Sequence, residues 1–114
     1  MKSNISKRDQ MLLMVKDLVL ETMQDVPVNI YLFGSWARNE EKRTSDIDVA
    51  FDSQKKISIK KWVELRDKID ESTIPYHVDL VDLQNTNSDL IMKVKREGIL
   101  WKDYKKDSKA QIEP

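Results

Sequence analysis

Cysteine is absent from this chain, glycine occurs only twice, and there is a single histidine. Without a thiol, the protein can form neither disulfide bonds nor cysteine-ligated zinc sites, and thiol catalysis is excluded. The first residues, MKSNISKRDQ, contain no apolar stretch of the kind that a secretory signal requires. We therefore expect the protein to act in a reducing cytoplasm.

Long hydrophobic runs and an excess of charge of either sign are also missing. No apolar stretch approaches the roughly 20 residues that span a bilayer, so we expect no membrane segment. The 20 basic residues balance the 20 acidic ones, so no net field attracts the chain to nucleic acid. Any anionic ligand must therefore be held by a local arrangement of residues.

A chain of 114 residues is long enough for one domain with a single core. We assign that domain to residues 1–103. Residues 104–114 are polar and lack periodicity, so we predict a disordered tail there.

Helical and strand periodicities alternate along the chain. They predict helices over residues 6–23, 58–70 and from 87 or 88 to 97, and strands over residues 28–33, 46–52, 76–83 and 99–101. This order indicates an α/β or α+β fold, a small mixed sheet of about four strands covered by helices.

Two details of the helices are predicted as well. The helix that ends near residue 97 is expected to close on Gly98 in the left-handed conformation. The core side of the helix over residues 58–70 is expected to carry Ile59, Trp62, Val63, Ile69 and, in part, Arg66.

Two aspartates stand one residue apart in the predicted strand DIDVAFD. Asp46 and Asp48 would point to the same face, and at an effective dielectric near 20 they would repel by roughly 2 to 3 kcal/mol. A hard divalent cation such as Mg²⁺, which takes oxygen ligands, would relieve that repulsion. An EF-hand is excluded, since Ala50 and Phe51 stand where its loop needs an oxygen ligand and a glycine. Such a pair can equally be an ordinary solvent-facing pair.

A third aspartate strengthens the case for a cation site. Asp79 lies on the polar face of the predicted strand YHVDLVDL, and three carboxylates converge if that strand neighbours DIDVAFD. Asp82 falls on the other face or at the strand end. His77 shares a face with Asp79, but a lone histidine is more often structural.

Gly34 and Ser35 follow directly on the predicted strand VNIYLF. At a strand-to-helix turn, a residue without a Cβ lets the backbone approach a ligand closely, and Ser35 offers an amide and a hydroxyl to a phosphate oxygen. Neither a Walker A loop nor the dinucleotide-binding fingerprint is present, because no GK[ST] and no further glycines follow. Together with the aspartates, this pair indicates a site for a metal-bound nucleotide.

The segment GSWARNEEKRTSDIDVAFD, residues 34–52, resembles the signature of the nucleotidyltransferase superfamily, a Gly-Ser pair followed by an Asp-x-Asp strand in a polymerase-beta-like fold. Its GSxAR and SDID forms are similar to those of the minimal nucleotidyltransferases (MNT), the antitoxins paired with HEPN-domain toxins. The resemblance extends over essentially the whole chain, from the first helix through REGILW.

The resemblance implies a function and a set of site residues. Gly34 and Ser35 would contact the triphosphate, while Asp46, Asp48 and Asp79 would hold Mg²⁺, with two ions expected. The implied reaction moves AMP from ATP to a tyrosine of a HEPN-type toxin, which the antitoxin silences in a complex with it.

Arg38, Asp79 and Asn39 are considered individually. Arg38 is expected to bind the nucleotide through its positive charge, and Asp79 is our candidate for the general base. The resemblance is imperfect at Asn39, since the family usually has glycine there. Asparagine tolerates positive φ better than most residues, so the turn can survive.

Two other functions stay open. A small-molecule nucleotidyltransferase of the aminoglycoside-modifying sort would need an acceptor pocket, for which this chain is short. A non-catalytic antitoxin would neutralise its partner by occlusion and keep only a vestigial nucleotide site. Trp36 and Trp101 are candidates for a partner contact, or for the core.

Overall fold

The structure, a computed structural model, describes residues 5–105. These residues form two compact units, a helical unit of residues 5–25 and 58–75 and a sheet unit of residues 26–57 and 76–105. Tyr104 and Lys105 are helical, and the rest of the predicted tail lies outside the described residues. None of the described helices is long and apolar enough to cross a membrane.

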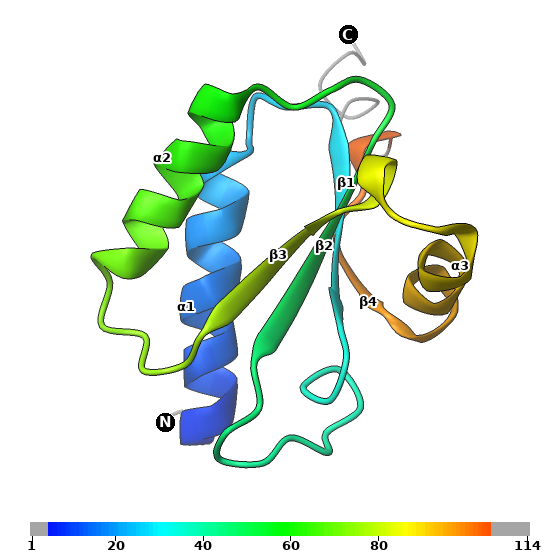
Figure 1. Cartoon of the computed structure of the whole chain (residues 1–114). Coiled ribbons are helices and arrows are strands. Elements are labelled where there is room, and N and C mark those ends of the chain that lie inside the picture. The colour runs from blue at the N-terminus through cyan, green and yellow to red at the C-terminus, as the bar shows by residue number, and fades with distance from the viewer. Residues whose placement is uncertain (1–4, 106–114) are drawn as a thin grey trace, which may run out of the picture. The chain divides into compact units, whose positions relative to one another are not determined.

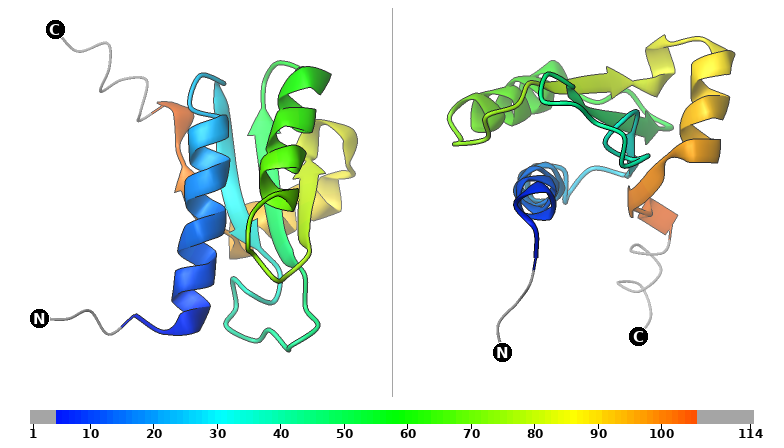
Figure 2. Two further views of the ribbon diagram at one scale, coloured as in Figure 1. Left: turned by 90° about the vertical axis from the view of Figure 1, so that its left-hand side faces the viewer. Right: turned by 90° about the horizontal axis from the view of Figure 1, so that it is seen from below.

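The helical unit contains α1 (Lys7–Thr22) and α2 (Ile59–Asp70), which lie side by side (Figures 1 and 2). The first helix begins at Ser6, as predicted, because the Ser6 hydroxyl accepts a hydrogen bond of 3.1 Å from the Asp9 amide. Its fully buried side chains include Val15 and Val19, which are spaced by four residues and so lie on one stripe.

The predicted core side of α2 was right for Ile69 and wrong for Ile59 and Val63. Ile59 and Val63 are 71% and 51% exposed, whereas Leu65 and Ile69 are buried. At 3.6 residues per turn, Leu65 and Ile69 share a stripe that is roughly a third of a turn away from the stripe of Ile59 and Val63. Because α2 carries hydrophobic residues on both stripes, the sequence pattern alone gave a mixture of the two. Trp62, on the buried stripe, was placed correctly and is half-buried.

The sheet unit contains four strands in the order β3-β2-β1-β4 (Figure 1). β1 pairs antiparallel with β2 and β4, and β2 pairs parallel with β3. The predicted mixed sheet of about four strands is thus confirmed. The strands are β1 (Val28–Phe33), β2 (Ile47–Ser53), β3 (Val78–Asp82) and β4 (Ile99–Lys102), with a short 3₁₀ helix, η1 (Leu83–Asn85), after β3.

Alternation along the strands separates two faces of this sheet. One face carries fully buried residues such as Leu32 and Val49. On the other face, Val94 of α3 (Ser88–Glu97) packs against Ala50, together with Tyr31, Phe33, Val81, Leu83, Leu90 and Ile91. This second face also carries the aspartates of interest, at the end of the sheet where β1 finishes.

α3 begins as predicted and ends differently. The Asn87 side chain accepts a 2.8 Å hydrogen bond from the Leu90 amide and so caps the helix. Gly98 does stop the helix, but its φ of −75° and ψ of 158° are extended and not left-handed. A Cβ at Gly98 would lie 3.2 Å from the Leu32 carbonyl oxygen and would collide with the Val94 carbonyl oxygen. The closeness of the Val94 carbonyl in the last turn of α3, together with a tight approach to Leu32 of β1, and not a special φ, therefore requires glycine here.

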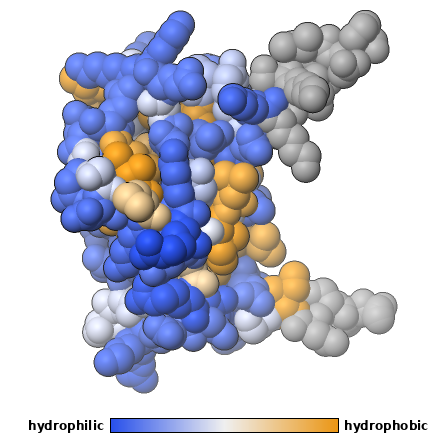
Figure 3. All heavy atoms as spheres, turned by 90° about the vertical axis from the view of Figure 1, so that its right-hand side faces the viewer, coloured by the Kyte–Doolittle hydropathy of each residue, from blue (hydrophilic) through white to orange (hydrophobic). Residues whose placement is uncertain are grey.

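Hydrophobic side chains reach the surface on the side of the sheet unit that carries α3 and β4. Figure 3 shows them as separate patches on a largely hydrophilic face. Met92 is 62% exposed, and Ile99 and Leu100 of the edge strand β4 are 47% and 46% exposed. Since β4 is an edge strand of four residues, it offers only a short unpaired edge.

Candidate active site

The loop after β1 is a compact turn and not the start of a helix. The amides of Ala37 and Arg38 donate to the Gly34 carbonyl at 3.1 and 3.2 Å, and the Glu40 amide donates to the Ser35 carbonyl at 2.9 Å. Residues 35–39 form turns, and no helix follows before β2. The predicted strand-to-helix turn is thus present only as a single turn.

Two residues of this loop have positive φ. Gly34 has a φ of 79°, which glycine adopts at no steric cost. Asn39 has a φ of 60°, so it adopts the left-handed conformation that asparagine tolerates. The turn therefore forms with asparagine where the family usually has glycine, as we expected.

The loop touches the first of the strand aspartates directly. Asp48 is the antiparallel register partner of Phe33, the last residue of β1. A Cβ at Gly34 would lie 3.2 Å from the Asp48 Cγ and would collide with its Oδ2. Gly34 is thus required both by its φ and by the closeness of a carboxylate, which answers why a chain with only two glycines has one at this position.

Asp79 lies beside Asp48. The two are register partners in the parallel β2–β3 pair, so their side chains share one face of the sheet. The registers of the two strands are tied by the hydrogen bond from the Ile47 amide to the His77 carbonyl, 2.9 Å long. Asp46 precedes β2, which begins at Ile47, and it is exposed.

Crowded carboxylates perturb Asp48. Burial raises the pKa of Asp48 to about 6, with further upward contributions from the charges of Asp79 and Asp46. The positive charges of Arg38 and His77 oppose this rise and do not cancel it. The electrostatics therefore couple all three predicted aspartates at one place.

Asp46, Asp48 and Asp79 are oxygen donors of the kind that a hard cation takes, but they are not arranged as a metal site. Among residues 5–105, no three histidine, aspartate or glutamate side chains form a group arranged to hold a metal ion. Three like charges repel one another, which favours separated rotamers when nothing positive lies between them. Carboxylate oxygens on two adjacent strands remain the ligand chemistry that Mg²⁺ prefers.

Arg38 reaches the loop and α3 at the same time. Its Nε donates to Glu40 Oε1 at 3.0 Å, and its Nη1 lies 3.7 Å from Glu97 Oε1 at the end of α3. The Arg38 side chain is 39% exposed. Sequence reasoning missed Glu97, because 59 residues separate it from Arg38 and only the sheet brings them together.

The remaining residues considered from the sequence fall outside the site or support it. Trp36 is 2% exposed, donates through Nε1 to the Ser45 carbonyl at 3.3 Å, and packs edge-on against Tyr76 with ring centroids 4.9 Å apart. It is a core residue of the loop, while Trp101 is half-buried. Asp82 ends β3, and its carboxylate accepts from the Gln84 amide at 3.0 Å, so it caps η1 as a structural residue.

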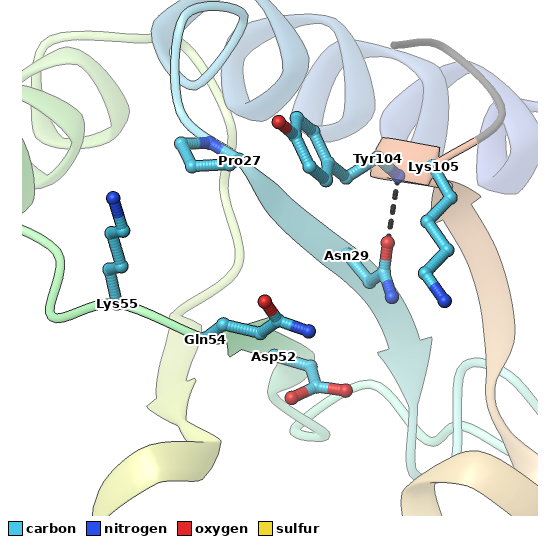
Figure 4. Close-up of a pocket in the computed structure, with 7 residues that line it drawn as sticks. All are labelled: Pro27, Asn29, Asp52, Gln54, Lys55, Tyr104 and Lys105. Atoms are coloured by element: carbon cyan, nitrogen blue, oxygen red, sulfur yellow. Dashed lines mark hydrogen bonds between the residues drawn. The ribbon is translucent and has the colours of Figure 1, made fainter. Parts of the chain in front are cut away.

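A cavity of about 210 Å³ lies elsewhere on the sheet unit. Figure 4 shows its lining, in which the Tyr104 amide donates to Asn29 Oδ1 at 2.7 Å. Asn29 and Asp52 are register partners at the opposite end of the β1–β2 pair from Phe33 and Asp48. This cavity is therefore not the site that the aspartates form.

A Gly-Ser turn facing paired strand aspartates on a small mixed sheet defines a nucleotidyltransferase. Residues 19–107 match the family described as polymerase beta, nucleotidyltransferase, and the chain belongs to that family.

Relatives of known name are protein adenylyltransferases. The protein adenylyltransferase MntA of Thermococcus cleftensis is 35% identical over 70 residues, which cover 61% of this chain and 70% of the relative. A chain in the crystal structure of a toxin–antitoxin with AMP-PNP is 28% identical, with a TM-score of 0.64 over 83% of this chain and 78% of that one. A further match is the structure of a tri-AMPylated HEPN toxin of Shewanella oneidensis in complex with its MNT antitoxin, with 25% identity and a TM-score of 0.58 over 86% and 77% of the two chains.

Proposed function

We propose that this protein is a Mg²⁺-dependent adenylyltransferase that moves AMP from ATP to a hydroxyl, that of a tyrosine, on a HEPN-type toxin and so acts as the toxin's antitoxin. The observation that carries the proposal is the contact between the Gly34 turn and Asp48, with Asp79 in register beside it. The likeness to chains in toxin–antitoxin structures supports the choice of partner. Because the reaction consumes ATP, we place it in the cytoplasm.

Asp46, Asp48 and Asp79 would hold the cation, expected to be two Mg²⁺ ions. When bound, Mg²⁺ would offset the charge of the triphosphate and lower the pKa of the attacking hydroxyl. The raised pKa of Asp48 supports this assignment, since a carboxylate that is costly to ionise gains most from a nearby cation.

The loop residues would bind and orient the triphosphate. Gly34 leaves the backbone open to close approach, and the Ser35 amide and hydroxyl can donate to a phosphate oxygen. The Arg38 guanidinium, with five N–H donors, has donors to spare beyond its contacts with Glu40 and Glu97. These groups would hold the α-phosphorus in line with the acceptor.

The transfer itself needs one proton acceptor from this chain. The tyrosine oxygen would attack the α-phosphorus, its P–O bond would form as the bond to the β-phosphate breaks, and pyrophosphate would leave. Asp79 is exposed and can face the acceptor, so we assign it the phenolic proton. The acceptor protein would complete the cleft from outside.

The test needs a HEPN-type partner protein, which we expect a neighbouring gene to encode. Incubation of the two proteins with ATP and Mg²⁺ should add AMP to a tyrosine of the partner, which intact-mass and peptide mass spectrometry detect. The double variant Asp46→Asn, Asp48→Asn should add none. A wild-type protein that modifies nothing, although both proteins are folded, would contradict the proposal.

Occlusion without catalysis is the main alternative, and the same variants test it. If the double variant still protected cells from the toxin at equal expression, the toxin would be neutralised by binding alone. A vestigial site would be favoured by the replacement of the family's usual glycine with Asn39, but Asn39 adopts a φ of 60° and the turn is formed. We therefore favour catalysis. The small-molecule alternative predicts drug resistance in cells that express this protein alone.

A further inference from the structure

The only two glycines of the chain meet the same end of β1. Gly34 follows β1 and makes room for the Asp48 carboxylate, whereas Gly98 brings the end of α3 against the Leu32 carbonyl. A hydrogen bond of 2.7 Å from the Gly98 amide to the Val94 carbonyl fixes that end of the helix. The C-terminal end of α3 is thus held next to the loop of residues 34–39, the proposed nucleotide-binding loop.

The last residue of α3 is a glutamate, which a helix end alone does not favour. The C-terminal end of a helix carries partial negative charge, so a basic residue is preferred there. Glu97 nevertheless occupies this position, and its two carboxylate oxygens face two arginines: Oε1 lies 3.7 Å from Arg38 Nη1 and Oε2 lies 3.7 Å from Arg96 Nη2. The contact with Arg38 links α3 to the loop that follows Gly34.

We propose that Glu97 is a positioning residue that aims Arg38 at the triphosphate, and that Gly98 is glycine because a Cβ there would displace the end of α3 that carries Glu97. The inference rests on the proposed function. Arg38 contacts two carboxylates, Glu40 through Nε and Glu97 through Nη1. With two of its edges held, the planar guanidinium has one orientation, and Nη2 stays available for a phosphate oxygen.

The role of Glu97 is one of binding and not of chemistry. The ion pairs of Glu97 are with Arg38 and Arg96, so its loss should weaken the binding of ATP and leave the rate of transfer at saturating ATP nearly unchanged. An arginine without its second tether would sample several rotamers, and ordering it again costs free energy at each binding event.

The test measures the binding of AMP-PNP and Mg²⁺ by calorimetry, together with the kinetics of AMP transfer to the toxin partner. Glu97→Gln should raise the dissociation constant and KM for nucleotide about five-fold, with kcat within about two-fold of the wild type. Arg96→Gln is the matched control, because it breaks the other ion pair of Glu97 and keeps the one with Arg38. It should bind nucleotide as the wild type does.

Gly98→Ala tests whether the position of the end of α3, which carries Glu97, affects nucleotide binding. The extended φ and ψ of Gly98 suit alanine, so any effect comes from the collision of the new Cβ with the Val94 carbonyl, which moves the end of α3. This variant should also bind nucleotide more weakly, with thermal unfolding measured to confirm that it is folded.

Three outcomes would overturn the inference. Nucleotide binding by Glu97→Gln equal to that of a wild-type protein that binds and transfers AMP would remove Glu97 from the mechanism, and the proposed function would stand. An equal loss of binding in Arg96→Gln and Glu97→Gln would assign the effect to the surface charge of α3 and not to Arg38. A wild-type protein that neither binds AMP-PNP nor transfers AMP would contradict the proposed function as well.

Discussion

Asp48 and Asp52 lie on the same strand and the same face of the sheet, four residues apart, in opposite surroundings. Asp52 forms an ion pair of 3.2 Å with Lys95 of α3, at the end of the sheet that carries the cavity. Asp48, at the loop end, has acidic neighbours in Asp79 and Asp46. Within residues 5–105, no basic side chain lies within 4.0 Å of its carboxylate.

The surroundings of Asp52 and Asp48 indicate which end of the sheet is suited to a positively charged ligand. A lysine from α3 satisfies one aspartate, so the fold can supply a cation to this face. At Asp48 it supplies instead more negative charge and a glycine that opens access. The acidic charge crowded beside the Gly34 turn is the charge that the proposed metal-bound nucleotide would offset.

The strongest test of this comparison exchanges each aspartate for asparagine. Asp48→Asn should lower AMP transfer by about 100- to 1,000-fold, because it removes a group that acts on the reacting phosphate through the cation. Asp52→Asn removes the same charge from the same strand and should leave transfer within about two-fold. The measurement is the initial rate of toxin modification. Equal losses in the two variants would show that the loop end is not special.

Gly34→Ala should have the next largest effect. Alanine at a φ of 79° costs about 1–2 kcal/mol, and its Cβ would also collide with the Asp48 carboxylate. We expect a loss of about 2–4 kcal/mol in the free energy of unfolding and at least a ten-fold loss of transfer, since the loop must shift. Urea unfolding and the transfer assay check this. An active variant of wild-type stability would contradict the close approach of loop and carboxylate.

The raised pKa of Asp48 predicts that the free energy of unfolding depends on pH when no metal is bound. Its pKa of about 6 in the folded chain exceeds the value of 3.8 for an unperturbed aspartate, so the folded state binds the proton more tightly. The resulting stabilisation is complete below a pH of about 4 and is lost as the pH rises through about 6. With EDTA at pH 7.5, Asp48→Asn should therefore be more stable than the wild type by about 1 kcal/mol, after allowance for partial exposure.

That difference should shrink when Mg²⁺ is added, because a cation at the site stabilises the ionised wild type and not the amide. Thermal unfolding at several pH values, with and without Mg²⁺, measures both effects. A wild type that is more stable than Asp48→Asn in EDTA at pH 7.5 would contradict the electrostatic picture.

The smallest effect is expected at the other end of the comparison. Lys95→Gln breaks an ion pair whose partners are 51% and 30% exposed, so the free energy of unfolding should fall by no more than about 1 kcal/mol. AMP transfer should not change. Chemical denaturation in low and high salt checks the first expectation, since screening should reduce the loss further.

Much of the fold and most of the candidate site could be predicted from the sequence. Ser6, Ser58 and Asn87 marked the helix starts correctly, because capping depends on residues that are neighbours in the chain. The strands followed from period-two patterns, and the motif of residues 34–52 led to the family. Each of these signals lies within a short stretch of the chain, so it can be recognised in the sequence alone.

The errors and omissions involve contacts between distant segments. The stripe of α2 that is buried depends on what packs against the helix, and Ile59 and Val63 satisfied the same local pattern as Leu65 and Ile69. Gly98 matched a helix stop, but its φ is not the expected left-handed one, and besides the Val94 carbonyl of its own helix a Cβ there would crowd the Leu32 carbonyl, 66 residues earlier. No local rule contains such a distance.

By itself the sequence determined that the chain has a Gly-Ser turn, Asp46, Asp48 and Asp79 in its predicted strands, and the elements of a mixed α/β sheet. Only the tertiary structure decided that β3 pairs parallel with β2 in the register that sets Asp79 beside Asp48, and that α3 ends where Glu97 meets Arg38. The physical reason is that side-chain periodicity and capping arise within a few residues. Register and the meeting of charges are instead fixed by hydrogen bonds and packing between segments that the chain separates.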